Sequence, residues 1–213
     1  HWCNVRLAKT DPVRDHLMLA FAAAVFFLII SPGPGVLSTA GVGAAYGYRN
    51  GLAYVAGLFA GSNLVAMLVI SGVAATALAL PWLRTTLLIA SLGYLLWLAW
   101  RIASAGAQIG FIEARTPLGF WNGLALQPIN PKAYVVNTTL FTGFSFMPDA
   151  LWLETAIKLL IMNLIWIPLH LGWLGAGISL RRLDLGPQAQ RRVNIAMALS
   201  MLVAVGLALW SQT

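Results

Sequence analysis

The sequence predicts an all-α integral membrane protein with six transmembrane segments, arranged as two inverted three-helix repeats. Sixty per cent of the 213 residues are hydrophobic and 9% are charged, whereas about 25% of the residues in an ordinary soluble domain are charged. Apolar runs of membrane-spanning length recur along the whole chain. The first and the fourth of these runs are broken by proline motifs. Together these observations exclude a soluble domain.

The predicted organisation is a polar N-terminal tail, residues 1–16, followed by a single transmembrane transporter domain, residues 17–210. Repeat one covers residues 17–103 and repeat two covers residues 118–210. The six segments are expected at residues 17–45, 51–80, 85–103, 118–146, 150–180 and 193–210. The tail lacks the basic-then-apolar order of a cleavable signal, so we expect the first apolar stretch to be a retained span.

The first segment is broken in its middle by Ser31-Pro32-Gly33-Pro34-Gly35. The apolar run before the break, residues 17–30, rises only about 21 Å as a helix, and a bilayer core is about 30 Å thick. Each proline removes a backbone donor. In hydrocarbon such a break survives only inside a bundle or beside a water-filled cavity. It indicates either a simple proline kink or a discontinuous helix of the kind from which transporters build binding sites.

The fourth segment has a similar break, Gln127-Pro128-Ile129-Asn130-Pro131-Lys132. Asn63 lies 31 residues after Pro32, and Asn163 lies 32 residues after Pro131. The halves therefore match as three segments plus three, and an odd number of spans per repeat requires inversion. Discontinuous segments at corresponding places in two halves are the best sequence indication of a transporter's site. The alternative is that the match between the two halves arose by chance.

Basic residues predict an orientation. The chain has 13 Lys and Arg against 6 Asp and Glu, a net charge of +7. The connections after the first, third and fifth segments lie on one face, which the positive-inside rule makes cytoplasmic. That face carries Arg49, Arg101, Arg115, Arg181, Arg182, Arg191 and Arg192. Both termini are then expected outside, although the basic residues Arg6, Lys9 and Arg14 of the tail favour the opposite orientation. The positive charge is therefore assigned to these loops and not to nucleic acid, and the lipid bilayer is the expected surrounding.

Several classes of function lack their required residues. One cysteine, Cys3, forms no internal disulfide, redox pair or thiolate metal site. The three histidines, His1, His16 and His170, show no metal-ligand spacing, and no aspartate lies in the centre of a span. We therefore expect no catalytic residue, metal or cofactor, and no enzyme activity. The alternative to an amino-acid transporter is an exporter of another small solute or of a metal ion held by carbonyl oxygens.

An ordered set of motifs resembles a family. Ser31-Pro32-Gly33-Pro34-Gly35 is similar to the signature of the LysE/RhtB amino-acid exporters, and Gly47-Tyr48-Arg49-Asn50-Gly51-Leu52 to the family's next feature. The run from Leu92 to Arg101 resembles the end of the third span. Asn130-Pro131-Lys132-Ala133, preceded by Gly119 to Asn122, resembles the second motif. The likeness covers residues 17–210. Many members carry Asp or Asn at the position of Gly35. Glycine has no side chain, so any polar contact made by that Asp or Asn is absent here.

The resemblance implies a bacterial inner-membrane exporter of amino acids or close derivatives, driven by the proton gradient. It leaves open which amino acid is exported and whether the protein is a homo-oligomer. A half-helix N-terminus suits a substrate carboxylate, and unwound carbonyls suit an ammonium group. The predicted frame of the substrate-binding site is Pro32, Gly33, Pro34, Asn130, Pro131 and Lys132, with Asn63 and Asn163 beside it.

Lys132 is the basic residue in the middle of a predicted span, and an intramembrane ionisable group indicates function. It is expected to attract the substrate carboxylate or to respond to protons, unless its stem reaches an interface or its ammonium caps freed carbonyls. Asn63 and Asn163 have an alternative too, because asparagines also bond helix to helix.

Four further features have simpler interpretations. His170 is a candidate for proton coupling because histidine titrates near neutral pH, but a lone histidine is more often packed in the core or placed at an interface. Glu154 and Lys158 lie one turn apart near the outer end, which indicates a surface pair. The small-xxx-small pattern from Gly57 to Gly61 predicts close helix packing. Nine tryptophans, several near span ends, fit interfacial anchoring.

Overall fold

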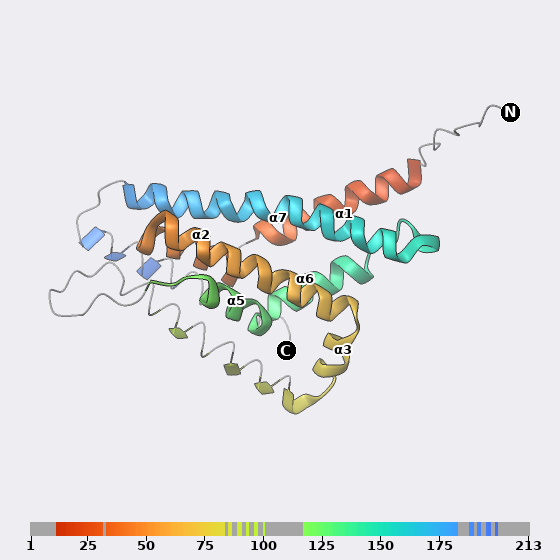
Figure 1. The fold of residues 1–213 in the computed structure, drawn as a ribbon, viewed down its shortest axis with the longest axis horizontal. Coiled ribbons are helices and arrows are strands. Elements are labelled where there is room, and N and C mark those ends of the chain that lie inside the picture. The colour runs from red at the N-terminus through yellow and green to blue at the C-terminus, as the bar shows by residue number, and fades with distance from the viewer. Residues whose placement is uncertain are drawn as a thin grey trace.

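The computed structural model describes residues 12–31, 33–83 and 117–182, together with isolated positions between 85 and 100 and between 188 and 199. Within these ranges the chain is helical and no strand is present. Three helices there are long and apolar enough to cross a membrane: Pro12–Ile30, Pro34–Ile70 and Pro148–Ser179. The prediction of an all-α membrane protein is confirmed for this part of the chain. Figure 1 shows these helices along the long axis of the molecule.

Helix α1, Pro12–Ile30, starts inside the predicted polar tail, before the apolar run begins at Leu17. Proline is favoured in the first turn because its missing N–H needs no partner there, and Asp15 in that turn complements the helix dipole. Residues 1–11 of the predicted tail lie outside the described residues. The helix ends at Ile30, directly before the first predicted break.

Helix α2, Pro34–Ile70, turns back on itself at Gly47, whose φ of 78° lies in the left-handed region that favours glycine. Tyr54 Oη donates to Ser38 Oγ at 2.9 Å. In a straight helix residues 38 and 54 would be about 24 Å apart. The first arm, residues 34–46, and the second arm, residues 48–70, are therefore antiparallel. The predicted loop at residues 46–50 is this turn.

The second arm ends earlier than predicted. We expected one apolar segment to run from Gly51 to about Leu80, but α2 stops at Ile70. Gly72, with φ of 76°, breaks the helix, and the short helix α3, Val73–Leu78, follows in a new direction (Figure 1). The 23 residues of the second arm rise about 35 Å, which is already enough to cross a bilayer core. Residues 71–80 are therefore not needed for the span.

The fourth segment consists of two short helices, α5, Phe120–Ile129, and α6, Pro131–Thr142, separated by Asn130. Asn130 has an extended backbone, with φ of −83° and ψ of 107°, a conformation that a following proline favours over the helical one. A 3₁₀ turn, Pro148–Ala150, leads into α7, Leu151–Arg182. The predicted break of the fourth segment is therefore present.

Contacts fix the relative directions of the helices. Phe21 packs against Phe144 with ring centroids 5.5 Å apart, while Ser31 contacts Lys132, so α1 and the fourth segment run antiparallel. Antiparallel broken segments are what inverted repeats require. The third and sixth predicted segments lie largely outside the described residues. The six-segment inverted repeat therefore stays a prediction.

Glycines allow α2 to pack closely against α5 and α7. A Cβ atom added to Gly57 would collide with the carbonyl oxygen of Phe120, and one added to Gly61 would lie 2.8 Å from that of Leu124. Gly177 of α7 meets the carbonyl of Ala40 in the same way. The predicted close packing at Gly57 and Gly61 is thereby confirmed.

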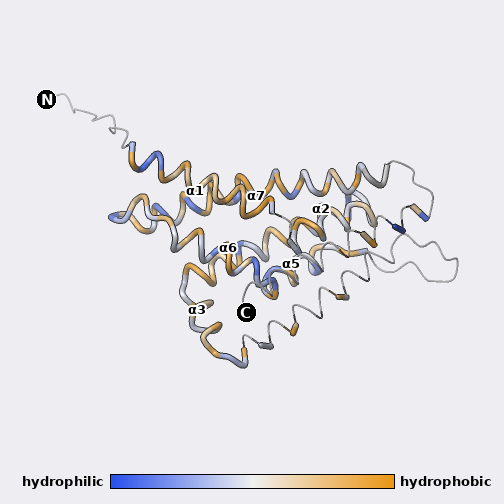
Figure 2. The backbone as a smooth tube through the Cα atoms, turned by 180° about the vertical axis from the view of Figure 1, so that it is seen from behind, coloured by the Kyte–Doolittle hydropathy of each residue, from blue (hydrophilic) through white to orange (hydrophobic). Residues whose placement is uncertain are grey.

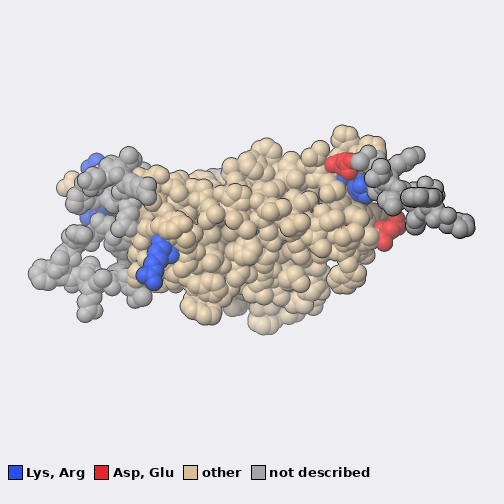
Figure 3. Space-filling model, turned by 45° about the horizontal axis from the view of Figure 1, so that its top comes forward, with Lys and Arg blue, Asp and Glu red and all other residues tan. Residues whose placement is uncertain are grey.

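Figure 2 shows hydrophobic residues along the described helices, and many large apolar side chains are exposed. Leu19, Phe27, Trp121 and Trp152 are each at least two-thirds exposed. In the view of Figure 3 the charged side chains gather near the two ends and leave the middle uncharged. This distribution matches a bilayer, whose core is apolar and whose surfaces are polar.

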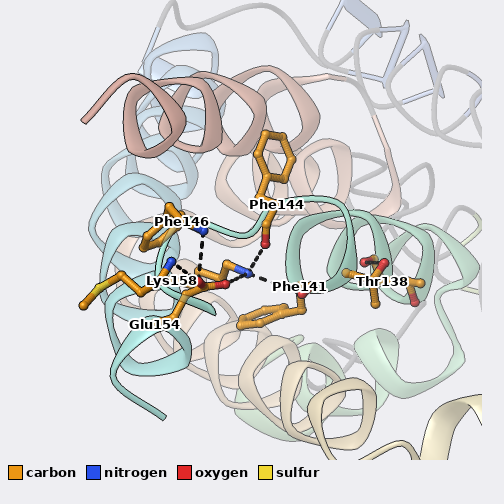
Figure 4. A network of polar contacts seen from close by, with 8 residues as sticks. Thr138, Phe141, Phe144, Phe146, Glu154 and Lys158 are labelled. Atoms are coloured by element: carbon orange, nitrogen blue, oxygen red, sulfur yellow. Dashed lines mark hydrogen bonds and ion pairs between the residues drawn. The ribbon is translucent and has the colours of Figure 1, made fainter. Parts of the chain in front are cut away.

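Glu154 and Lys158 contradict the prediction of a surface pair, because both are at least 95% buried. Their ion pair is 2.6 Å long. Glu154 Oε2 accepts hydrogen bonds from the backbone N–H groups of Phe146 and Met147, and Lys158 Nζ donates to the carbonyl oxygens of Phe141 and Phe144 (Figure 4). The pair is buried because the segment after α6 leaves backbone groups unpaired, and these two side chains satisfy them.

Candidate functional site

The two breaks meet at a cavity that residues of both breaks line. All the long helical elements contribute to its wall. The lining residues are Leu28, Ile29, Ser31, Gly33, Gly35, Val36, Ser62, Gln127, Asn130, Lys132, Ala133, Val136, Asn137, Met162, Trp166 and His170. The wall is thus largely apolar, with a few polar groups from both broken segments.

Lys132 joins the two breaks. Its Nζ donates to the carbonyl oxygen of Ser31 at 2.6 Å and to Ser31 Oγ at 2.7 Å. Ser31 follows the last residue of α1, so this carbonyl belongs to the negative end of the helix dipole. The expected alternative of a lysine capping freed carbonyls is therefore realised here. The same ammonium also lines the cavity and is half-buried.

The two half-helices that begin at the breaks differ in their capping. Asn130 caps α6: its Oδ1 accepts a hydrogen bond from Lys132 N at 3.1 Å, and its Nδ2 donates to Gln127 Oε1 at 3.2 Å. Gly33 stands at the corresponding position of α2 and supplies no side-chain cap. The first amides of α2 therefore lack the side-chain partner that those of α6 have. Gly35 and Val36, in this first turn, line the cavity.

The absence of a side chain at Gly33 leaves room for the Lys132 side chain. A Cβ atom on Gly33 would lie 2.8 Å from Lys132 Cδ and 3.1 Å from its Nζ, so a larger residue would displace the lysine. Pro34 and Pro131 are the first residues of α2 and α6 and set the directions of the two half-helices. Pro32 lies outside the described residues.

Asn63 and Asn163 bond to each other. Asn63 Nδ2 donates to Asn163 Oδ1 at 3.1 Å, and Asn163 Nδ2 donates to Asn63 Oδ1 at 2.9 Å. This reciprocal pair joins the second arm of α2 to α7, as the helix-to-helix alternative expected. Their sequence neighbours Ser62 and Met162 line the cavity. Substrate contact by the asparagines themselves stays a prediction.

His170 is part of the cavity wall, although the sequence favoured simple packing for it. Its ring stacks on Trp166 with centroids 3.6 Å apart, and its Nδ1 lies 3.0 Å from the Trp166 carbonyl oxygen. An ideal Cβ on Gly35 would lie 3.6 Å from His170 Nε2 and from Gln127 Nε2. The imidazole therefore borders the end of the cavity where Gly35 leaves space.

Several lining residues were not predicted from the sequence, among them Ser62, Asn137, Met162 and Trp166. Asn137 lies seven residues after Asn130 on the same helical face, and Trp166 lies one turn before His170. Helical spacing from the predicted residues could therefore have found two of them.

The fold and the cavity define a class: a helical membrane protein whose discontinuous helices meet at an internal site. The LysE type translocator family matches residues 26–213, and the chain belongs to this family. The resemblance noted in the sequence is therefore confirmed. No solved structure matches the chain.

Three relatives illustrate the likeness, and each is named a cysteine/O-acetylserine efflux protein. That of Salmonella paratyphi A is 31% identical over 129 residues, which are 60% of this chain and 65% of the relative. That of Escherichia coli K12 is 27% identical over 86% of this chain and 92% of the relative. A second E. coli relative, from strain O139:H28, is 27% identical over 87% of this chain and 94% of its own length. This chain thus spans slightly less than two thirds of the Salmonella protein's length.

Proposed function

We propose that this chain is a secondary transporter that exports a small amino acid or close derivative across the bacterial inner membrane. The names of its relatives make cysteine and O-acetylserine the first substrates to test. The observation that carries the proposal is the meeting of both breaks at one cavity, with Lys132 reaching from the second break to the first. Such a site suits a zwitterion, which needs donors at one end and acceptors at the other.

In this proposal the substrate carboxylate binds between the Lys132 ammonium and the first turn of α2. Both attract an anion, one by its full charge and the other by its N–H groups and helix dipole. A competing anion would weaken the bond from Lys132 to Ser31 and so loosen the contact between the breaks. Gly33, Pro34, Asn130 and Pro131 serve as the frame, as Pro32 does by prediction.

We further propose that the proton gradient drives export and that both termini lie outside. The cavity offers two titratable groups, Lys132 and His170, and its lining contains no carboxylate among the described residues.

Export of a metal ion is the weaker alternative, because the lysine ammonium repels a cation. In the described part of the chain no group of three or more metal-ligating side chains occurs.

The test is amino-acid export from cells loaded with cysteine-containing dipeptides. Cells with the intact protein are compared with cells carrying an empty vector, and all extracellular amino acids are measured together. The proposal predicts that at least one amino acid or derivative accumulates faster outside the producing cells. Equal accumulation of every amino acid, with the protein present in the membrane, would contradict it.

A further inference from the structure

Asn137 has an unexplained polar atom beside the cavity. Its side chain is 97% buried and lines the cavity wall. Its Nδ2 donates to the carbonyl oxygen of Ala133 at 2.8 Å, which fixes the orientation of the amide. Its Oδ1 is buried and has no hydrogen-bond partner among the described residues. Buried polar atoms are normally paired, so this acceptor calls for a donor that the described protein does not supply.

The position of Asn137 relative to Lys132 limits what the donor can be. Both residues belong to α6, five positions apart, or about 7.5 Å along the helix axis. Lys132 supplies the positive charge of the site and repels other cations, so an ammonium group must lie away from it. An amino acid whose carboxylate meets Lys132 therefore presents its ammonium group further along the cavity, toward an acceptor.

We propose that Asn137 binds the α-ammonium group of the substrate through its Oδ1. This assignment rests on the proposed amino-acid export and deepens it, since it orients the substrate in the cavity. The carboxylate lies at Lys132 and the first turn of α2, and the ammonium group lies at Asn137. The substrate side chain then points to the part of the cavity bordered by Gly35, Gln127 and His170.

The experiment uses the full chain in proteoliposomes, with L-cysteine under a thiol reductant as the transported probe. Its competitor is 3-mercaptopropionate, which is cysteine without the ammonium group. Three variants are compared with the unaltered protein: Asn137→Leu removes the acceptor, Asn137→Asp keeps an oxygen in its place, and Thr142→Val is the matched control. Thr142, like Asn137, donates to the carbonyl four residues earlier on α6, but it is exposed.

The unaltered protein is expected to prefer cysteine to 3-mercaptopropionate by about tenfold to a hundredfold, the range for a charge-assisted hydrogen bond. Asn137→Leu should weaken cysteine to about the level of 3-mercaptopropionate and leave the latter nearly unchanged. Asn137→Asp and Thr142→Val should retain the preference.

Two results in Asn137→Leu would overturn the inference: an undiminished preference for cysteine, or equal weakening of both compounds, which indicates a structural role. Loss of the preference in Asn137→Asp would overturn it as well, and this holds even when Asn137→Leu fails to fold. Absence of cysteine transport by the unaltered protein would overturn the proposed function at this substrate, and the inference with it.

Discussion

Lys132 of α6 and Lys158 of α7 have different surroundings. Lys158 is fully buried, pairs with Glu154 at 2.6 Å and donates to two backbone carbonyls. Lys132 is half-buried and lines the cavity, and its ammonium group donates only to Ser31 among the described residues. No described carboxylate forms an ion pair with it. The comparison separates a lysine that the protein neutralises from one whose charge no described carboxylate neutralises.

The two regions also hold different parts of the chain together. The Glu154–Lys158 pair, which we call the outer clamp, attaches the segment after α6 to α7 (Figure 4). The contact between Lys132 and Ser31 attaches the two breaks to each other. A substrate anion could replace the second contact but not the first, because the clamp's cation already has its anion. The clamp is therefore expected to affect stability, and the break contact to affect transport.

The largest effect is expected from breaking the outer clamp on one side. Lys158→Met leaves the Glu154 carboxylate buried without its cation, which should cost about 3–5 kcal/mol of stability. The double variant Glu154→Gln/Lys158→Met removes both charges and should recover most of this loss, since glutamine still accepts a backbone hydrogen bond. Unfolding in detergent measures both variants. A double variant as unstable as the single one would show that the ion pair is not the source of the effect.

Displacing Lys132 should have the next largest effect, and two glycines provide a matched comparison. Gly33→Ala places a methyl group 2.8 Å from Lys132 Cδ and should move the ammonium away from Ser31. Gly172→Ala, on α7 and outside the cavity lining, adds a methyl group that meets no atom within 4 Å. We expect transport to fall about tenfold for Gly33→Ala, as for loss of a charge-assisted bond, and to stay near normal for Gly172→Ala. Similar rates in both variants would contradict the placement of Lys132.

The neutral pair Asn63–Asn163 should give the smallest effect on stability. Hydrogen bonds between membrane helices contribute about 0.6 kcal/mol on average, so Asn63→Leu should lower stability only slightly. A double-mutant cycle with Asn163→Leu measures their coupling. Transport by the same variants tests the sequence prediction that these asparagines contact substrate. A large loss of transport in stable protein would support substrate contact, and unchanged transport would refute it.

The sequence contained the breaks and the lysine between them, because prolines and an intramembrane charge are local signals. Its family resemblance was sufficient to indicate the class of protein. The end of α2 at Ile70 was missed because Gly72, in an apolar context, resembles the glycines that pack inside the helices. The outer clamp was mispredicted for a different reason. The hydrogen-bond partners of Glu154 are backbone groups eight and seven residues earlier, beyond a turn, and helical spacing cannot reveal them.

The cavity could be predicted only in part. Asn130 and Lys132 follow from the second break, and helical spacing extends the prediction to Asn137 and Trp166. Ser62 and Met162 line the cavity because five helices meet there. Their meeting depends on the turn at Gly47 and on the glycine contacts of α2, which bring segments far apart in sequence together. Tertiary packing of this kind leaves no pattern in any one helix.

The role of Lys132 is tested by comparing cysteine transport by the unaltered protein and by Lys132→Met in proteoliposomes with equal protein content. Methionine keeps the apolar stem and removes the charge. We expect a loss of transport of at least about tenfold in a variant whose unfolding temperature is nearly that of the unaltered protein. Equal transport by the two proteins would contradict a substrate-binding role for Lys132 and, with it, the site between the two breaks.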